Sequence, residues 1–289
     1  MTATTSKASG SVLGAWFHRI SLLRESPVGM VGAFIVVFWV VVAIFAPVLS
    51  PYDPNETHYD MLAFLHPSSQ HWFGLDSSGR DMLSRIIWGS RTVLIVAPLA
   101  VGVAYLVGCS LGLLAGYYIG WVDVLMSRIT NIILSIPPIV LFIIIITLFG
   151  PSVINLIIAF TLIAAPQIAR LVRGITLELR ERDFVAAAKM RGEGSLYIMV
   201  VEILPNARGP LIVDLCLRTG YTIIQIGVLG FLGLGLPPPT PDWGGMVNQG
   251  YAQLFSYPHM SIFPCIAISS LVIGFNFLAD GMREISLRD

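Results

Sequence analysis

Charged residues are scarce in this chain of 289 residues. Asp, Glu, Lys and Arg make up 12% of it, whereas hydrophobic residues make up 55% and the mean hydropathy is +0.80. Because roughly a quarter of the residues in an average soluble domain are charged, this composition excludes an ordinary soluble fold and indicates an integral membrane protein. The 17 basic and 17 acidic residues balance, so net charge predicts no nucleic-acid partner.

Cysteine and histidine are few, and their positions exclude most site chemistry. Cys109, Cys216 and Cys265 each lie in an apolar stretch, where a thiol behaves as a small hydrophobic group, so no disulfide or metal site is expected. Residues 108–112 match the G-x-S-x-G pattern of serine hydrolases, but Ser110 has no histidine in any long apolar run to act as its base. An intramembrane hydrolase is therefore the least favoured function. The chain also lacks a G-x-x-x-x-G-K-[ST] motif, so we expect it to bind no cofactor and to hydrolyse no ATP itself.

Long apolar runs are what the chain has in abundance. A helix needs about 20 apolar residues to cross a hydrocarbon core of about 30 Å. The runs that qualify are 28–49, 92–118, 124–149, 153–172, 210–236 and 262–282. We therefore predict an all-α, polytopic membrane protein with six transmembrane helices.

Two sequence features predict how these helices are shaped and packed. Gly108, Gly112, Gly116 and Gly120 recur every fourth residue, a spacing that lets helix backbones approach closely in lipid. Pro137, followed by a second proline, should kink the third span, because proline lacks the backbone N–H.

The distribution of Lys and Arg predicts the orientation of the chain. Cytoplasmic loops hold an excess of these residues, and they collect in residues 173–208, whereas the loops 150–152 and 237–260 contain none. We expect residues 173–208 and both termini in the cytoplasm.

The same pattern divides the chain into three parts. Residues 1–27 are expected to form a cytoplasmic segment with an amphipathic pattern. Residues 28–91 hold the first transmembrane helix and an external segment. Residues 92–289 form a five-helix core that contains the cytoplasmic loop 173–208.

Asp214 and Arg218 are the charged residues that we assign to membrane depth. Placing a charged side chain at membrane depth costs free energy, so such residues are functional candidates. Their spacing of four, with the acid first, favours a helical ion pair. A structural pair, a gate and a substrate contact all remain open. A secondary transporter would normally need more intramembrane acids than one, so ATP-independent transport is a disfavoured alternative.

The loop 173–208 contains the most specific signal. Residues 184–190 are rich in alanine and should form a helix, Gly192 and Gly194 should break it, and Ser195 should open a second helix that Pro205 ends. On these features alone, the loop is either an ordinary amphipathic connector or a helix that inserts into a partner.

The same residues resemble the EAA loop of ATP-binding-cassette (ABC) import permeases, with two departures. Ala186 stands where the pattern has glutamate, and Glu202 stands where isoleucine is usual. The resemblance implies that the loop couples to an ATPase. The residues to which this role is carried over are Phe184, Ala186, Ala187, Ala188, Gly192, Leu204 and Pro205.

Three further segments are similar to peptide-type permeases of the dipeptide, oligopeptide and nickel class, in particular to the second permease subunit. They are residues 71–85, 230–244 and 275–283. On physical grounds, Asp76 and Asp81 fit a turn that caps the next helix, and contact with a binding protein is the alternative. Residues 237–241 read as a stiff exposed run, and Trp243 reads as an aromatic residue at the membrane interface.

The resemblance implies a type I ABC importer permease core in a bacterial cytoplasmic (inner) membrane. The implied role is half of a translocation pore, as a transport subunit rather than an enzyme. The implied partners are a homologous second permease subunit, two ATPase subunits that hold ATP and Mg, and an extracytoplasmic solute-binding protein. The implied cargo is a dipeptide, an oligopeptide, an opine, a glutathione-like compound or a nickel chelate.

Overall fold

The computed structural model describes residues 26–58, 60 and 65–286, and the regular secondary structure of these residues is helical. The expected amphipathic pattern in residues 1–25 lies outside them. The helices are α2 (Pro27–Ile44), α3 (Ala46–Leu49), α4 (Met82–Tyr117), α5 (Trp121–Ser135), α6 (Pro138–Phe149), α7 (Val153–Leu179), α8 (Asp183–Met190), α9 (Ser195–Tyr197), a π-helix (Ile198–Ile203), α10 (Leu204–Asn206), α11 (Arg208–Phe231), α12 (Trp243–Tyr251) and α13 (His259–Ser286).

The prediction of an all-α protein with six spans is confirmed, with one span broken. Helices α2, α4, α7, α11 and α13 are each long and apolar enough to cross a membrane. The sixth span is the pair α5 and α6, whose axes differ by 85°. Pro137 interrupts this span and Pro138 begins α6, where its missing N–H costs nothing. The predicted kink is therefore a sharp bend.

Two helix boundaries differ from the prediction. Helix α4 begins at Met82 rather than at residue 92, because Asp81 caps it and its polar first turns are covered by the external segment. Helix α7 continues to Leu179 rather than ending at residue 172. Apolar runs alone end too early where polar residues continue a helix.

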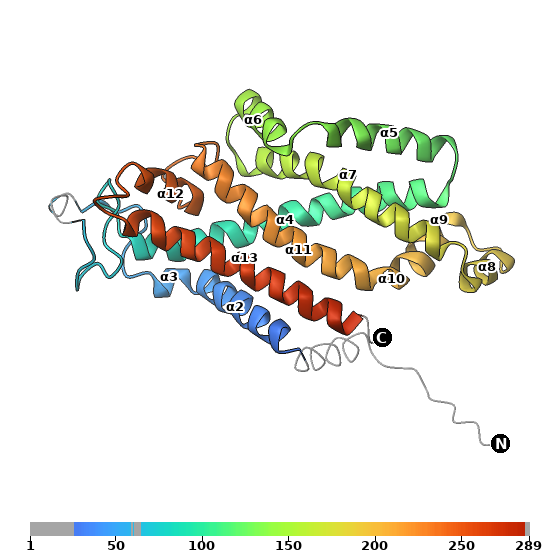
Figure 1. Ribbon diagram of the computed structural model, residues 1–289, viewed down its shortest axis with the longest axis horizontal. Helices are drawn as coiled ribbons and strands as arrows, with labels where there is room; N and C mark the ends of the chain where they lie inside the picture. The colour runs from blue at the N-terminus through green and yellow to red at the C-terminus, as the bar shows by residue number, and fades with distance from the viewer. Residues whose placement is uncertain (1–25, 59, 61–64, 287–289) are drawn as a thin grey trace, which may run out of the picture.

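Helix α4 lies at the centre of the bundle. It packs most extensively on α7 and also contacts α2, α5 and α11, while α13 joins α2 to α11. Figure 1 shows α8 and α9 at one end of the molecule and α12 at the other, and we call these the α8 end and the α12 end. The start of α2 meets the end of α13, since a Cβ added to Gly281 would lie 2.4 Å from Gly29 Cα.

Glycines explain how closely α4 and α7 approach. A Cβ added to Gly108, Gly112 or Gly116 would lie 2.6–2.9 Å from atoms of α7, including the backbone oxygens of Ala165 and Ala169. The predicted packing role is thus observed for these three glycines. It is wrong for Gly120, which precedes α5 at φ +111° and has open space around it.

Trp243 is buried, which contradicts its predicted place at the membrane interface. Its indole N–H donates to Ile86 O at 3.0 Å, and its ring packs edge-on against Trp39 with centroids 5.0 Å apart. Gly89 leaves the space for the ring, because a Cβ there would lie 2.5 Å from it. Of the adjacent run 237–241, which was predicted to be exposed, residues 237–240 are exposed and Pro241 is buried.

Candidate functional site

The segment that joins α7 to α11, residues 183–206, folds into short helices at the α8 end (Figure 1). We call it the α8 segment. Helix α8 ends where the N–H of Gly192 donates to Lys189 O at 3.0 Å and the N–H of Glu193 donates to Ala188 O at 3.2 Å. Gly192 has φ +79°, a left-handed conformation that favours glycine. The predicted break after the alanine-rich helix therefore has a backbone cause.

One face of α8 anchors the segment to the bundle. Val185 and Ala188 are fully buried. They pack in one cluster with Ile198 and Ile203 of the π-helix and with Val172 of α7. Because the cluster spans both halves of the segment and α7, the segment is attached to the bundle as a unit.

An ion pair joins the two halves of the α8 segment. The guanidinium of Arg191 donates from Nη2 to Glu202 Oε1 at 2.9 Å and lies 3.7 Å from Glu193. Glu202 occupies the position where the EAA pattern has isoleucine. Its carboxylate therefore gives this chain a polar link that an isoleucine at the same position could not make.

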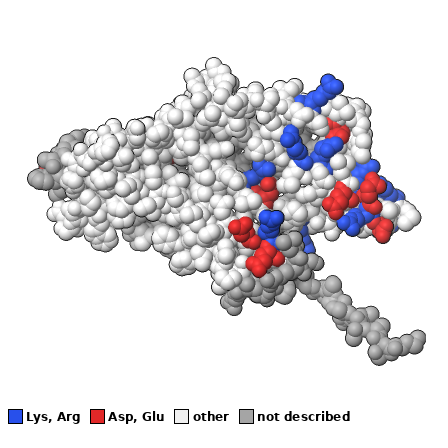
Figure 2. All heavy atoms as spheres, viewed as in Figure 1, with Lys and Arg blue, Asp and Glu red and all other residues white. Residues whose placement is uncertain are grey.

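The outer side of the α8 segment exposes apolar residues among charges. Met190 is 83% exposed and Leu196 is 71% exposed, and large apolar side chains of the π-helix are also exposed. In Figure 2 the Lys, Arg, Asp and Glu of the visible face gather over this end, and most of the rest is uncharged. Exposed apolar residues beside charges, outside the membrane-spanning helices, are typical of a protein contact.

The structure brings the seven residues of the EAA-like pattern into one segment but gives them different environments. Ala188 is buried, whereas Phe184, Ala187 and Leu204 are half-buried. Ala186, Gly192 and Pro205 are exposed. Contact with a partner is therefore open to the exposed residues, while Ala188 is part of the local core.

Asp214 and Arg218 belong to a larger polar network in the middle of the bundle. Arg218 Nε donates to Asp214 Oδ2 at 2.6 Å, and its Nη1 donates to Gln167 Oε1 at 2.9 Å. The hydroxyl of Tyr105 contacts the Asp214 carboxylate and lies 3.1 Å from Leu211 O. The network links α4, α7 and α11, and sequence spacing within one helix gave no signal for Tyr105 or Gln167.

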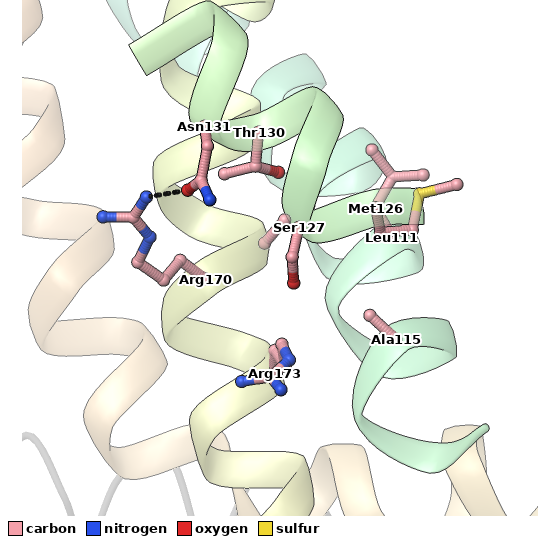
Figure 3. A pocket seen from close by; sticks show the side chains of 9 residues that line it. Leu111, Ala115, Met126, Ser127, Thr130, Asn131, Arg170 and Arg173 are labelled. Carbon is pink, nitrogen blue, oxygen red and sulfur yellow. Dashed lines mark hydrogen bonds between the residues drawn. The ribbon is translucent and has the colours of Figure 1, made fainter. Parts of the chain in front are cut away.

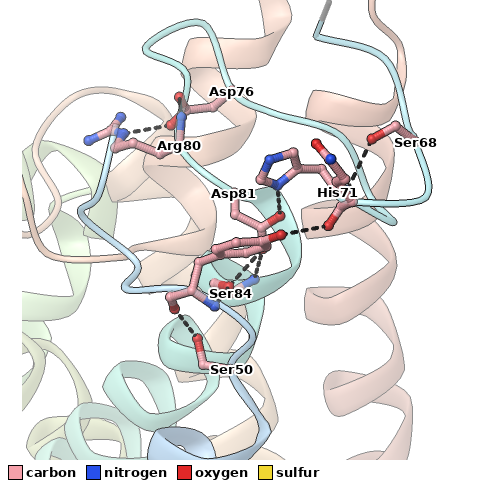
Figure 4. A network of polar contacts seen from close by, with 9 residues as sticks. Ser50, Ser68, His71, Asp76, Arg80, Asp81 and Ser84 are labelled. Atoms are coloured by element: carbon pink, nitrogen blue, oxygen red, sulfur yellow. Dashed lines mark hydrogen bonds and ion pairs between the residues drawn. The ribbon is translucent and has the colours of Figure 1, made fainter. Parts of the chain in front are cut away.

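At the α12 end, two buried carboxylates fold the external segment (Figure 4). Asp76 accepts from the backbone N–H of Ser78 at 2.8 Å and from Arg80 Nε at 2.7 Å. Asp81 accepts from the backbone N–H of Ser84 at 2.8 Å, and its other oxygen lies 2.9 Å from His71 Nδ1. These contacts use both carboxylates inside the protein, which agrees with the predicted capping turn.

Asp242 is a third buried carboxylate, and sequence reasoning missed it. It caps α12 by accepting from the N–H groups of Gly244 at 3.3 Å and Gly245 at 3.1 Å. Burial raises the pKa of its carboxyl from 3.8 to about 6. Gly230 and Gly235 make room for it, since a Cβ on either would lie within 2.5 Å of its Oδ2. The available signal was an acidic residue directly before a helix start.

Charged residues between α5 and α7 were also missed (Figure 3). Arg173 donates two hydrogen bonds to Asp123, at 2.5 and 2.6 Å, and Arg170 donates one to Asn131 at 2.9 Å. Arg173 was predicted to lie in a loop, and Arg170 was not among the charged residues predicted at membrane depth. Arg170 lies inside the predicted run 153–172, whereas Arg173 joins the same helix because α7 continues past that run to Leu179.

The hydrolase alternative finds no support at Ser110. Its hydroxyl donates to Leu106 O at 2.7 Å, as hydroxyls in helices commonly do, and so it is not paired with a base. Among the residues that the structure describes, no group of three His, Cys, Asp or Glu side chains could hold a metal ion. The three cysteines are free thiols.

Comparison with known proteins gives a consistent result over most of the chain. The family model of the binding-protein-dependent transport system inner membrane component matches residues 108–289. That of the N-terminal TM domain of oligopeptide transport permease C matches residues 16–67.

Individual relatives agree with these matches. The chain is 39% identical over 274 residues to the dipeptide transport system permease protein DppC of Alkalihalophilus pseudofirmus, covering 95% of this chain and 90% of the relative. It is 41% identical over 270 residues to the glutathione transport system permease protein GsiD of Escherichia coli, covering 93% of this chain and 89% of the relative. The GsiD protein of Shigella boydii matches equally well.

Proposed function

The chain belongs to the family of binding-protein-dependent transport system inner membrane components, and on that premise we propose that it forms half of the translocation pore of an ATP-driven importer for peptides or peptide-like solutes. It is a multi-pass permease subunit and not an enzyme, and such permeases work with a partner ATPase. The single observation that carries the proposal is the α8 segment, which presents exposed apolar residues beyond the ends of α7 and α11.

We further propose that the α8 end is cytoplasmic, with both termini on the same side. The support is the excess of Lys and Arg in residues 173–208 and their absence from residues 237–260 at the α12 end. On this orientation the α8 segment meets an ATPase. The exposed residues 237–240 are then the candidate surface for an extracytoplasmic solute-binding protein.

The proposed mechanism is alternating access driven by the α8 segment. The segment continues directly from α7 and leads directly into α11, so its displacement tilts these two helices relative to α4. The network of Tyr105, Gln167, Asp214 and Arg218 crosses this joint and would be rearranged by the motion. A differential affinity of a few kcal/mol between two states suffices to shift their populations.

The proposed assembly contains a homologous second permease subunit, two ATPase subunits that bind ATP and Mg, and the solute-binding protein. The proposed cargo is a small peptide or a peptide-like compound, because the named relatives carry dipeptides and glutathione. Opines and nickel chelates stay open, since selection would lie mainly in the solute-binding protein.

The coupling assignment is tested by Ala186→Trp. Ala186 is exposed on α8 and has ordinary helical geometry, so tryptophan should leave the fold intact and obstruct a partner's cleft. We expect the ATPases to lose co-purification with the variant in detergent and uptake to fall at least about tenfold, the effect of roughly 1.4 kcal/mol.

The matched control is Ala252→Trp, the same change at an exposed position of the α12 end. It should retain the ATPases. Undiminished co-purification and uptake in Ala186→Trp would remove the α8 segment from the contact. Equal loss in both variants would mean that tryptophan damages the protein generally.

A further inference from the structure

A polar cavity of about 280 Å³ lies between α4, α5 and α7 near the α8 end. In Figure 3 its polar side chains come from two helices, Ser127 and Asn131 from α5 and Arg170 and Arg173 from α7. Leu111 of α4 contributes to its apolar wall. The cavity therefore combines cationic and neutral hydrogen-bonding groups with an apolar side.

The charge of this cavity is not balanced. Asp123 neutralises Arg173 through two short hydrogen bonds. Arg170 is exposed and bonds to the neutral amide oxygen of Asn131, and no carboxylate among the described residues pairs with it. An arginine on a membrane-spanning helix without an acidic partner is expensive unless an anion or water reaches it.

The depth of Arg170 matches the headgroup layer. It is nearly five turns from Val153 at the start of α7, or roughly 25 Å at 1.5 Å per residue, close to the thickness of the hydrocarbon core of about 30 Å. Tyr118, directly after α4, and Trp121, the first residue of α5, are 43% and 77% exposed at the same end. Exposed aromatic residues of this kind mark the membrane interface.

An apolar groove continues from the cavity toward the middle of the bundle. A second cavity, of about 310 Å³, shares Leu111 with the first and is lined by Val107, Ile158 and Leu162, with Thr161 as its polar member. The two cavities together offer a cationic end at headgroup depth and an apolar end at hydrocarbon depth. This is the shape and polarity of a single anionic lipid.

Helix α5 supplies independent support, because it packs a half-buried face on α4 and α7 and leaves its opposite face exposed, with no residue fully buried. An exposed apolar face of a helix needs another molecule to cover it. A lipid lying along α5 covers part of that face and holds α5 in place.

We propose that these joined cavities bind one anionic phospholipid. The phosphate accepts hydrogen bonds from Arg170 and from the amide of Asn131, and an acyl chain follows the groove along Leu111 and Leu162. The hydroxyl of Ser127 donates to Asp123 at 3.3 Å and stays outside this set. Basic pockets between transmembrane helices are known to bind such headgroups. The proposal requires only that these helices span the membrane, so it is independent of the ATPase contact.

The test titrates the delipidated, purified importer, with all its subunits, with phosphatidylglycerol or phosphatidylcholine and counts bound lipids by native mass spectrometry. We expect one phosphatidylglycerol to bind preferentially. Arg170→Gln should weaken this binding about fivefold, the effect of about 1 kcal/mol for one arginine near the headgroups. Ile158→Trp, a change at a half-exposed groove position, should also weaken it by filling the acyl end.

The matched control is Arg128→Gln, which removes an exposed arginine of α5 that does not line the cavity and should leave the binding unchanged. Excess inorganic phosphate should not compete, since a free anion lacks the acyl chain; full competition would mean an anion site and overturn the lipid assignment. Equal binding of both lipids, or equal loss in Arg170→Gln and Arg128→Gln, would overturn the specific site. Cross-linking of Leu162→Cys to the second permease would show that a subunit covers the groove, and would overturn the proposal as well.

Discussion

At the scale of single residues, the three buried aspartates of the α12 end differ in what surrounds their charge. Asp76 has the guanidinium of Arg80, and Asp81 has the imidazole of His71. The direct partners of Asp242 are the backbone N–H groups of Gly244 and Gly245. Amide dipoles compensate burial less fully than a charged neighbour does, and the pKa of the Asp242 carboxyl rises to about 6.

The raised pKa predicts how stability depends on pH. Between about pH 4 and pH 6 the folded protein holds a proton at Asp242 that the unfolded chain has released, so the free energy of unfolding decreases as pH rises through this window. We expect Asp242→Asn, which removes the charge and keeps one of the two cap hydrogen bonds, to be more stable than the wild type at neutral pH by up to about 3 kcal/mol, and therefore to unfold at a higher temperature. The difference should vanish below about pH 4.

Thermal unfolding of both proteins in detergent across this pH range checks the prediction. Asp242→Ala is the control, because it removes the charge and the cap together and should be less stable than Asp242→Asn at every pH. A stability difference that stays constant with pH would contradict the assignment.

At the scale of elements, the polar network of Asp214 and Arg218 joins three helices that apolar packing alone would leave free to slide. Tyr105 belongs to α4, Gln167 to α7, and the ion pair to α11. Both charged side chains are about one fifth exposed, so the pair is neither a surface bridge nor fully desolvated. Its contribution to the free energy of unfolding should therefore lie between that of an exposed ion pair and that of a fully buried one.

A double-mutant cycle separates a coupled pair from two independent residues. Asp214→Asn or Arg218→Gln alone leaves a charge without its partner, and the cost should fall below the roughly 3 to 5 kcal/mol of a fully buried pair. The double variant should cost less than the sum of the single ones. Thermal unfolding of the purified protein measures the cycle. Tyr105→Phe, which removes one hydrogen bond of the same network, should cost about 1 kcal/mol. Simple additivity would show that the two charges do not interact.

The elements also show where sequence reasoning reaches its limit. Hydrophobic runs predict the six spans, because an apolar helix must be buried or lie in lipid wherever it packs. Helix ends follow other rules: α4 starts at the Asp81 cap, and α7 continues past residue 172, where Arg173 pairs with Asp123 of α5.

Contacts between distant elements leave no such periodic signal. Trp243 reads as interfacial in its proline-rich surroundings, yet Gly89, distant in the sequence, provides the space that buries it. Likewise, the spacing of Asp214 and Arg218 predicts their pairing, but their partners Tyr105 and Gln167 depend on how the helices meet. The break at Gly192 was predictable because it depends on local backbone conformation.

At the scale of the whole molecule, the proposed function depends on which side of the membrane the α8 end occupies. If it faced outward, no ATPase could reach it. We expect a single cysteine at Leu196, which is 71% exposed, to resist membrane-impermeant thiol reagents in intact cells, and a single cysteine at Thr240 to react.

The labelling requires a background in which Cys109, Cys216 and Cys265 are replaced by serine or alanine. Permeabilised cells provide the control, because both introduced cysteines should then react. The reverse pattern in intact cells would invert the topology, and the importer assignment would have to be given up.

The contact of α2 with α13 has a consequence for how the protein is made. Gly29 and Gly32 lie directly against the backbone of α13 near Gly281 and Leu278, so the first span finds its closest partner in the last one. At a translation rate of about 5 to 20 residues per second, α2 waits in the bilayer for roughly 10 to 50 s before α13 emerges. During biogenesis the glycine face of the first span thus stays uncovered until the final helix arrives, and a ribosome that stops before α13 leaves that face exposed to lipid.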